Sequence, residues 1–126
     1  MIGMSMHKVL IVEDDADVQK MYARFFELAK FDVDTASDGA IGIQKAIKFQ
    51  PGVILLDVMM PTMDGIEALK NLKADDRTKA IDVIMLTNLS DDITHDTCLA
   101  LGAKGYMIKV DFSPHEIIEQ VNASFA

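Results

Sequence analysis

The chain is poor in cysteine and in long apolar runs. Cys98 is the only cysteine among 126 residues, so no disulfide can form within the chain. No stretch reaches the roughly 18 consecutive apolar residues that a membrane-spanning helix needs. The first residues also lack the basic start and the long apolar run of a secretory signal peptide. These absences favour a reducing, cytoplasmic setting and predict no association with a membrane.

Positive charge is scarce as well. Twelve Lys and Arg stand against 20 Asp and Glu, which gives a net charge of −8. Because nucleic-acid affinity rests largely on cationic contacts with phosphates, we expect the chain not to bind nucleic acid by itself. The same deficit argues against binding to anionic lipid.

Short apolar runs alternate with helical periodicities along the whole chain. The runs are rich in Val and Ile and predict buried strands, and the acids within the second run predict an edge strand. These strands are expected over residues 7–12, 32–36, 53–56, 81–86 and 106–108. Apolar residues at helical spacing follow each strand. We therefore predict one α/β domain whose parallel sheet is covered on both faces and joined by right-handed crossovers.

Chemically useful side chains follow four of the predicted strands. Glu13, Asp14 and Asp15 follow the first, Asp57 the third, Thr87 closes the fourth, and Lys109 follows the fifth. Ligands of such sheets bind beyond the carboxyl ends of the strands, so these groups should meet at one edge. Carboxylates this close repel one another unless a cation neutralises them, and a hard divalent ion such as Mg²⁺ suits oxygen ligands.

Structural roles remain open for the same residues. The acids at 13–15 could cap the first helix, because carboxylates suit helix N-termini. Lys109 could be a solvated strand end and Thr87 an ordinary strand residue. Tyr106, in the fifth strand, could be a half-buried aromatic residue with a wet hydroxyl.

The order of these residues resembles a known family. Glu13-Asp14, the segment Leu-Asp-Val-Met-Met-Pro-Thr-Met-Asp-Gly at 56–65, Thr87 and Lys109 are similar to the receiver domain of two-component response regulators. The resemblance implies a flavodoxin-like (βα)5 fold with strand order 2-1-3-4-5. It also implies that residues 1–126 form a single receiver domain with a core over about 7–124, and we expect no output domain.

The resemblance further implies a role for each site residue. Asp57 would be phosphorylated by a phosphohistidine of a sensor histidine kinase or a phosphotransfer protein. Mg²⁺ would be bound near Asp57 by Asp14 directly, by Glu13 through water, and by the backbone carbonyl of Met59. The only catalysis implied is Mg²⁺-dependent phosphorylation and dephosphorylation of the chain itself, so it would not be an enzyme acting on other substrates.

Three residues are implied to respond to the phosphoryl group. Thr87 and Lys109 would contact its oxygens, and Tyr106 would turn inward as Thr87 moves. This change would alter the surface formed by the fourth helix, fifth strand and fifth helix, where a downstream protein target would bind. The sequence leaves open whether the chain is a monomer or a weak, phosphorylation-dependent dimer.

Two positions depart from the family pattern. Val110 stands where the family usually has a proline joined by a cis bond to the lysine. Because a cis bond before a non-proline residue costs about 2.5–4 kcal/mol, we predict a trans Lys109–Val110 bond and a re-routed loop through Asp111 and Phe112. Asn88 is larger than the usual small residue after the threonine, and we expect it to narrow access to the site.

The sequence also bears on three other functions. A haloacid dehalogenase-type phosphatase needs a second acid two residues after the nucleophile, where this chain has Met59. A flavin or nucleotide carrier would need a Gly-rich phosphate loop, and neither common form of that loop is present. A pseudo-receiver that binds partners without being phosphorylated remains the alternative, because Val110 and Asn88 depart from the pattern.

Overall fold

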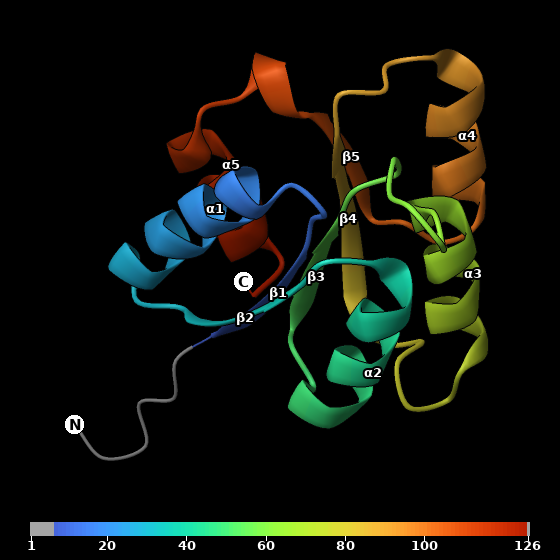
Figure 1. Cartoon of the computed structure of the whole chain (residues 1–126), viewed down its shortest axis with the longest axis horizontal. Coiled ribbons are helices and arrows are strands. Elements are labelled where there is room, and N and C mark those ends of the chain that lie inside the picture. The colour runs from blue at the N-terminus through green and yellow to red at the C-terminus, as the bar shows by residue number, and fades with distance from the viewer. Residues whose placement is uncertain (1–6, 126) are drawn as a thin grey trace.

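Five short parallel strands alternate with five α-helices over residues 7–125, the part of the chain that this computed structural model describes (Figure 1). The strands are β1 (Lys8–Val12), β2 (Asp32–Ala36), β3 (Val53–Leu56), β4 (Asp82–Thr87) and β5 (Gly105–Ile108). The helices are α1 (Ala16–Leu28), α2 (Gly39–Phe49), α3 (Gly65–Ala74), α4 (Asp92–Ala100) and α5 (Pro114–Ala123), with a short 3-10 helix η1 (Lys109–Asp111) after β5. The predicted α/β alternation is therefore confirmed.

The strands form one sheet in the order β2-β1-β3-β4-β5, and every pairing is parallel. This is the predicted order, with β2 at an edge. Val12 lies opposite Leu56, and Leu56 lies opposite Met85. The carboxyl ends of the central strands consequently meet at one edge of the sheet.

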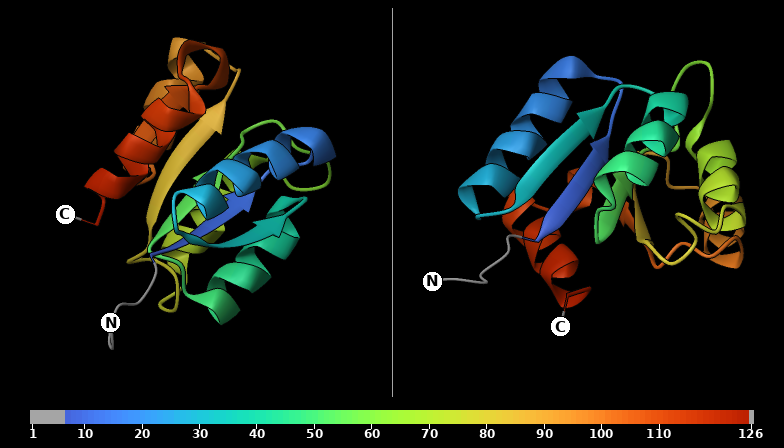
Figure 2. Two further views of the ribbon diagram at one scale, coloured as in Figure 1. Left: turned by 90° about the vertical axis from the view of Figure 1, so that its left-hand side faces the viewer. Right: turned by 90° about the horizontal axis from the view of Figure 1, so that it is seen from below.

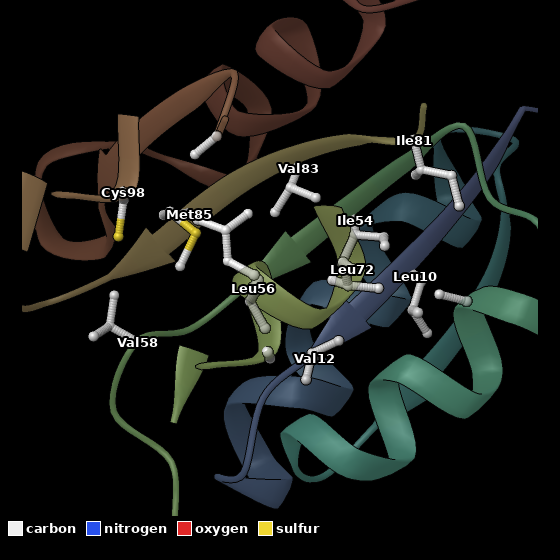
Figure 3. Close-up of a cluster of buried hydrophobic side chains, with 14 of the residues drawn as sticks. Leu10, Val12, Ile54, Leu56, Val58, Leu72, Ile81, Val83, Met85 and Cys98 are labelled. Carbon is white, nitrogen blue, oxygen red and sulfur yellow. The ribbon is translucent and has the colours of Figure 1, made fainter. Parts of the chain in front are cut away.

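Helices cover both faces of the sheet. Helices α1 and α5 lie together on one face, and α2, α3 and α4 lie on the other (Figures 1 and 2). Alternate strand residues supply two separate apolar layers. One layer includes Leu10, Ile54 and Met85 and is shown in Figure 3. The other includes Ile11 and Leu55 and packs around Phe26 of α1, which is fully buried.

Each α-helix begins with a side chain that caps free backbone N–H groups. Aspartates cap the first four helices. Ser113 caps α5: its hydroxyl accepts the Glu116 N–H, and the Glu116 carboxylate accepts the Ser113 N–H. Pro114 follows at the first turn of the helix. In the first helix the capping residue is Asp15, which accepts bonds from the N–H groups of Asp17 and Val18.

Four predicted strand boundaries, in three strands, differ by one residue. Strand β1 begins at Lys8 rather than at 7, and β5 begins at Gly105 rather than at 106. Strand β4 runs one residue later than predicted, because the N–H of Ile81 donates to Thr78 in a turn and the ladder begins where Asp82 meets Val53. A hydropathy pattern cannot separate a buried turn residue from a strand residue.

The loop after β5 differs from the family pattern in the way that the sequence predicts. No cis peptide bond occurs within residues 7–125, so the Lys109–Val110 bond is trans as predicted. The chain turns there through the 3-10 helix η1, which reaches Asp111. Within the same residues, no helix combines the length and the apolar character needed to cross a membrane.

Candidate functional site

Four strand ends bring the predicted site residues to one edge of the sheet. Glu13 follows β1, Asp57 follows β3, Thr87 ends β4 and Lys109 follows β5. Backbone hydrogen bonds extend the sheet into this region: Glu13 donates its N–H to Ala36 at 2.9 Å, and Asp57 donates to Val12 at 3.2 Å. The acids are therefore held by the sheet and do not lie on free loops.

Lys109 joins the two buried acids. Its Nζ donates to Oδ2 of Asp57 at 2.8 Å and also to Oε1 of Glu13. The lysine side chain is 13% exposed, and those of Glu13 and Asp57 are 4% and 8% exposed. One ammonium thus serves two carboxylates that are largely removed from water.

Burial and hydrogen bonding shift the pKa values of Glu13 and Lys109 in opposite directions. Burial raises the pKa of Glu13, and the hydrogen bonds from Lys109 and the Asp15 N–H offset only part of this effect. Burial would lower the pKa of Lys109, but its bonds to Asp57 and Glu13 outweigh burial and leave that pKa raised. Lys109 is therefore charged at neutral pH and neutralises part of the acidic cluster.

The loop that carries Glu13 is fixed by contacts that the sequence did not reveal. The Gln19 side chain donates to the backbone oxygens of Glu13 at 2.9 Å and Ala36 at 3.1 Å. The N–H of Asp15 donates to Oε2 of Glu13 at 3.1 Å. No local pattern marks Gln19, because its acceptors are 6 and 17 residues away along the chain.

The three acids after β1 have separate positions. Asp15 caps α1, Glu13 is buried against Lys109, and Asp14 is exposed. Helix capping, one of the structural roles left open above, therefore applies to Asp15. Glu13, Asp14 and Asp57 each offer a carboxylate oxygen within 4.8 Å of the others. Such a set of hard oxygen donors fits Mg²⁺, which usually takes one or two carboxylates and keeps several waters.

Both carboxylate oxygens of Asp57 accept a hydrogen bond. Oδ1 accepts a bond from the backbone N–H of Met59 at 3.1 Å, while Oδ2 faces Lys109. Ile11, Leu55 and Tyr22 pack beneath the acids and leave no space for a water molecule. The floor of the site is dry, which explains the raised pKa of Glu13. Tyr22 of α1 belongs to this floor.

Thr87 and Tyr106 meet through the backbone of Leu89. The Thr87 hydroxyl is buried and accepts a bond from the Leu89 N–H at 3.3 Å. The Tyr106 hydroxyl donates to the Leu89 carbonyl at 2.5 Å. Burial raises the pKa of Tyr106 to about 12, and the His95 ring packs edge-on at 5.2 Å. The two predicted switch residues thus hold the same loop residue.

The structure brings the predicted residues together to different degrees. Glu13, Asp57 and Lys109 are in direct contact, and Asp14 is close to both acids. Thr87 ends a neighbouring strand but makes no hydrogen bond to Asp57 or Lys109 within residues 7–125. Met59 contacts Asp57 through its N–H group, and its side chain is 61% exposed.

Comparisons with known proteins agree with this geometry. The family model for the response regulator receiver domain matches residues 9–122. The alkaline phosphatase synthesis transcriptional regulatory protein PhoP of Bacillus subtilis (strain 168) is 37% identical over 116 residues, which are 92% of this chain and 47% of that protein. The DNA-binding dual master transcriptional regulator RpaA of Synechocystis is 35% identical over 94% of this chain and 48% of its own length. The chain thus spans about half the length of these curated relatives.

A solved structure of a family member has the same fold. Chemotaxis protein CheY4 of Vibrio cholerae superposes with a TM-score of 0.88 at 31% identity, covering 95% of this chain and 99% of that one. The family model covers most of the chain, and the fold has the strand order expected for the family. The chain therefore belongs to the response regulator receiver domains of two-component systems.

Proposed function

We propose that Asp57 accepts a phosphoryl group from a phosphohistidine of a sensor histidine kinase or a phosphotransfer protein. The observation that carries this proposal is the position of Lys109, whose Nζ lies 2.8 Å from Asp57 beside two further acids. An Asp57 oxygen attacks phosphorus in line, a new O–P bond forms, and the P–N bond of the donor breaks. The electron pair of the broken bond stays on the imidazole nitrogen.

The residues around Asp57 suit this reaction because phosphoryl transfer depends mainly on positioning and charge neutralisation. Glu13, Asp14 and Asp57, with the Met59 carbonyl, would hold Mg²⁺. When bound, the ion supplies positive charge to the phosphoryl oxygens. Lys109, whose Nζ lies 2.8 Å from Oδ2 of Asp57, supplies a second positive charge. The dry floor strengthens these interactions, since charges interact more strongly where water is excluded.

Phosphorylation would change the bonds of the β4–α4 loop. The acyl phosphate adds negative charge and acceptor oxygens near Thr87. If the Thr87 side chain moves so that its hydroxyl reaches a phosphoryl oxygen, its bond from the Leu89 N–H is lengthened or lost. Leu89 also holds the Tyr106 hydroxyl, so the change reaches the surface of α4, β5 and α5. A downstream protein target that prefers one arrangement of this surface would read the signal.

The test is phosphorylation with a small donor. The chain is incubated with Mg²⁺ and acetyl phosphate, and its intact mass is measured over time. We expect one added phosphoryl group on the natural chain, none on Asp57→Asn, and none when a chelator removes Mg²⁺. An exposed carboxylate variant, Asp32→Asn, is the matched control and should be phosphorylated normally.

The same experiment distinguishes this function from the alternative, a pseudo-receiver. A pseudo-receiver would gain no mass with acetyl phosphate or with a phosphorylated histidine kinase domain. If the natural chain stays unmodified with both donors while a relative of the family is modified under the same conditions, the phosphoacceptor role is wrong. Mass gained equally by Asp57→Asn would move the reaction to another residue.

A further inference from the structure

Asn88 makes a contact that links two separate loops at the edge of the site. Its side-chain Oδ1 accepts the backbone N–H of Val110 at 3.2 Å. Asn88 directly follows Thr87 of β4, and Val110 directly follows Lys109 after β5. The hydrogen bond therefore connects the neighbours of the two residues that are proposed to contact the phosphoryl oxygens.

The Val110 N–H has no alternative partner in its own segment. Val110 lies in the first turn of η1, where backbone N–H groups have no acceptor within the helix. The residue before η1, Ile108, provides no side-chain cap. Asn88 supplies that acceptor from the β4–α4 loop, 22 residues earlier in the chain. A proline at position 110, with no N–H group, could not make this bond.

Asn88 contributes little to the packing of the fold. Its side chain is exposed, and Val110 is 79% exposed, so neither residue contributes to the apolar core. Lys109, one residue before Val110, is by contrast nearly buried between Asp57 and Glu13. The position of its backbone decides where its ammonium can reach.

We propose that Asn88 is a positioning residue for Lys109. By accepting the Val110 N–H, its side chain holds the start of η1 against the β4–α4 loop and keeps the lysine directed at Asp57 and Glu13. The β4–α4 loop and Lys109 then move together. The consequence for phosphorylation of Asp57 rests on the proposed function, whereas the position of Lys109 does not.

Three substitutions separate this role from simple control of access. Asn88→Leu keeps the bulk and removes the acceptor, Asn88→Ala removes both, and Asn88→Asp keeps an acceptor. Asn71→Ala is the matched control, since Asn71 is an exposed asparagine on α3 whose side chain donates to the Glu67 carbonyl and to Met63 Sδ, away from Asn88 and Val110. Unfolding by urea shows that each variant is folded before it is compared.

The first measurement needs no phosphoryl donor. Amide hydrogen exchange of Val110 should be about 2- to 10-fold faster in Asn88→Leu and Asn88→Ala, the range expected for loss of one hydrogen bond. The side-chain NMR signals of Lys109 should shift in the same two variants. Asn88→Asp should restore slow exchange, and Asn71→Ala should change neither readout. Unchanged Val110 exchange or unchanged Lys109 signals in Asn88→Leu would overturn the proposal.

The second measurement uses Mg²⁺ and acetyl phosphate. A loosened Lys109 should slow phosphorylation of Asp57 by about 3-fold or more in both Asn88→Leu and Asn88→Ala, because misplaced groups lose catalytic effect steeply. If Asn88→Leu reacts like the natural chain and only Asn88→Ala differs, Asn88 controls access and the positioning role is wrong. If the natural chain takes up no phosphoryl group, the proposed function fails, and the exchange and Lys109 signals still decide the role of Asn88.

Discussion

The Nζ of Lys109 lies 2.8 Å from Oδ2 of Asp57 and also donates to Glu13, so one ammonium neutralises two buried carboxylates. The two acids end different strands, and Lys109 follows a third. This pairing stabilises the edge of the sheet, and it engages two of the three carboxylates that would also bind a metal ion. Stability and metal binding should therefore respond in opposite directions when the lysine is lost.

Lys109→Met tests this relationship. Removing one partner leaves uncompensated buried charge, so the free energy of unfolding without Mg²⁺ should fall by about 3 kcal/mol. Mg²⁺ affinity should rise, because no ammonium competes for the carboxylates, and added Mg²⁺ should recover part of the lost stability. Urea unfolding and calorimetric Mg²⁺ titration measure both effects.

Lys104→Met is the control for that experiment. Lys104 pairs with Asp82 at 3.0 Å, but the two side chains are 52% and 33% exposed. Exposed pairs contribute little, so we expect a loss of less than about 1 kcal/mol and no change in Mg²⁺ affinity. Equal losses in the two variants would contradict the special role of Lys109.

Gly65→Ala should disturb the site through the backbone. A Cβ atom at Gly65 would lie 2.0 Å from the backbone oxygen of Asp57, so either the start of α3 or Asp57 must move. Because the neighbour is backbone and cannot rotate away, we expect a loss of about 3 kcal/mol, at the upper end for overpacking. Gly105→Ala has its nearest contact at 3.6 Å and should change stability little. Urea unfolding of both variants checks this, and equal stability of the two would contradict the clash.

Tyr106 should ionise only at high pH. Burial raises its pKa from the ordinary 10.0 to about 12, and burial also raises the pKa of Tyr22. The folded chain keeps the Tyr106 proton where the unfolded chain has lost it. This contribution to stability is thus complete below pH 10 and is lost as pH rises through about 12.

Ultraviolet titration of the phenolate band measures this directly. The natural chain should show little phenolate at pH 10, and Tyr106→Phe should remove the transition near 12 while that of Tyr22 remains. A Tyr106 that ionised at pH 10 would show that its hydroxyl is solvated and not held against Leu89.

Asp75 should keep its charge at unusually low pH. Hydrogen bonds from the Arg77 side chain, and then from its backbone N–H, lower the pKa of Asp75 from 3.8 to about 2. Because the folded pKa is lowered, the stabilisation is present above pH 3.8 and is lost as pH falls through about 2. In Arg77→Ala the Asp75 pKa, followed by carboxyl-carbon NMR, should rise towards 3.8 but stay below it, since the backbone bond remains. Lys79→Ala, which breaks the pair with Asp76, should leave Asp75 unchanged.

Much of the fold could be predicted because apolar residues repeat with a different period in strands than in helices. The strands over 32–36 and 53–56 were predicted at their observed bounds, and the strand order followed from the family resemblance. Four other strand boundaries shifted by one residue, as at Ile81, because the first ladder bond depends on the partner strand. That partner is not visible in the local pattern.

The sequence by itself determined which groups meet at the carboxyl edge. In a parallel sheet each strand ends at the same edge, so residues that follow strands, such as Glu13, Asp57 and Lys109, must gather there. The sequence also determined the trans bond at Val110, because only proline makes the cis form accessible at low cost.

Only the tertiary structure decided how these groups pair. Lys109 bonds to residues 52 and 96 positions away, Tyr106 holds the Leu89 carbonyl, and Asn88 accepts the Val110 N–H. Each contact joins segments whose separation is set by the packing of strands and helices on two faces of the sheet. Hydrogen bonds weaken within a few tenths of an ångström, which strand periodicity cannot resolve.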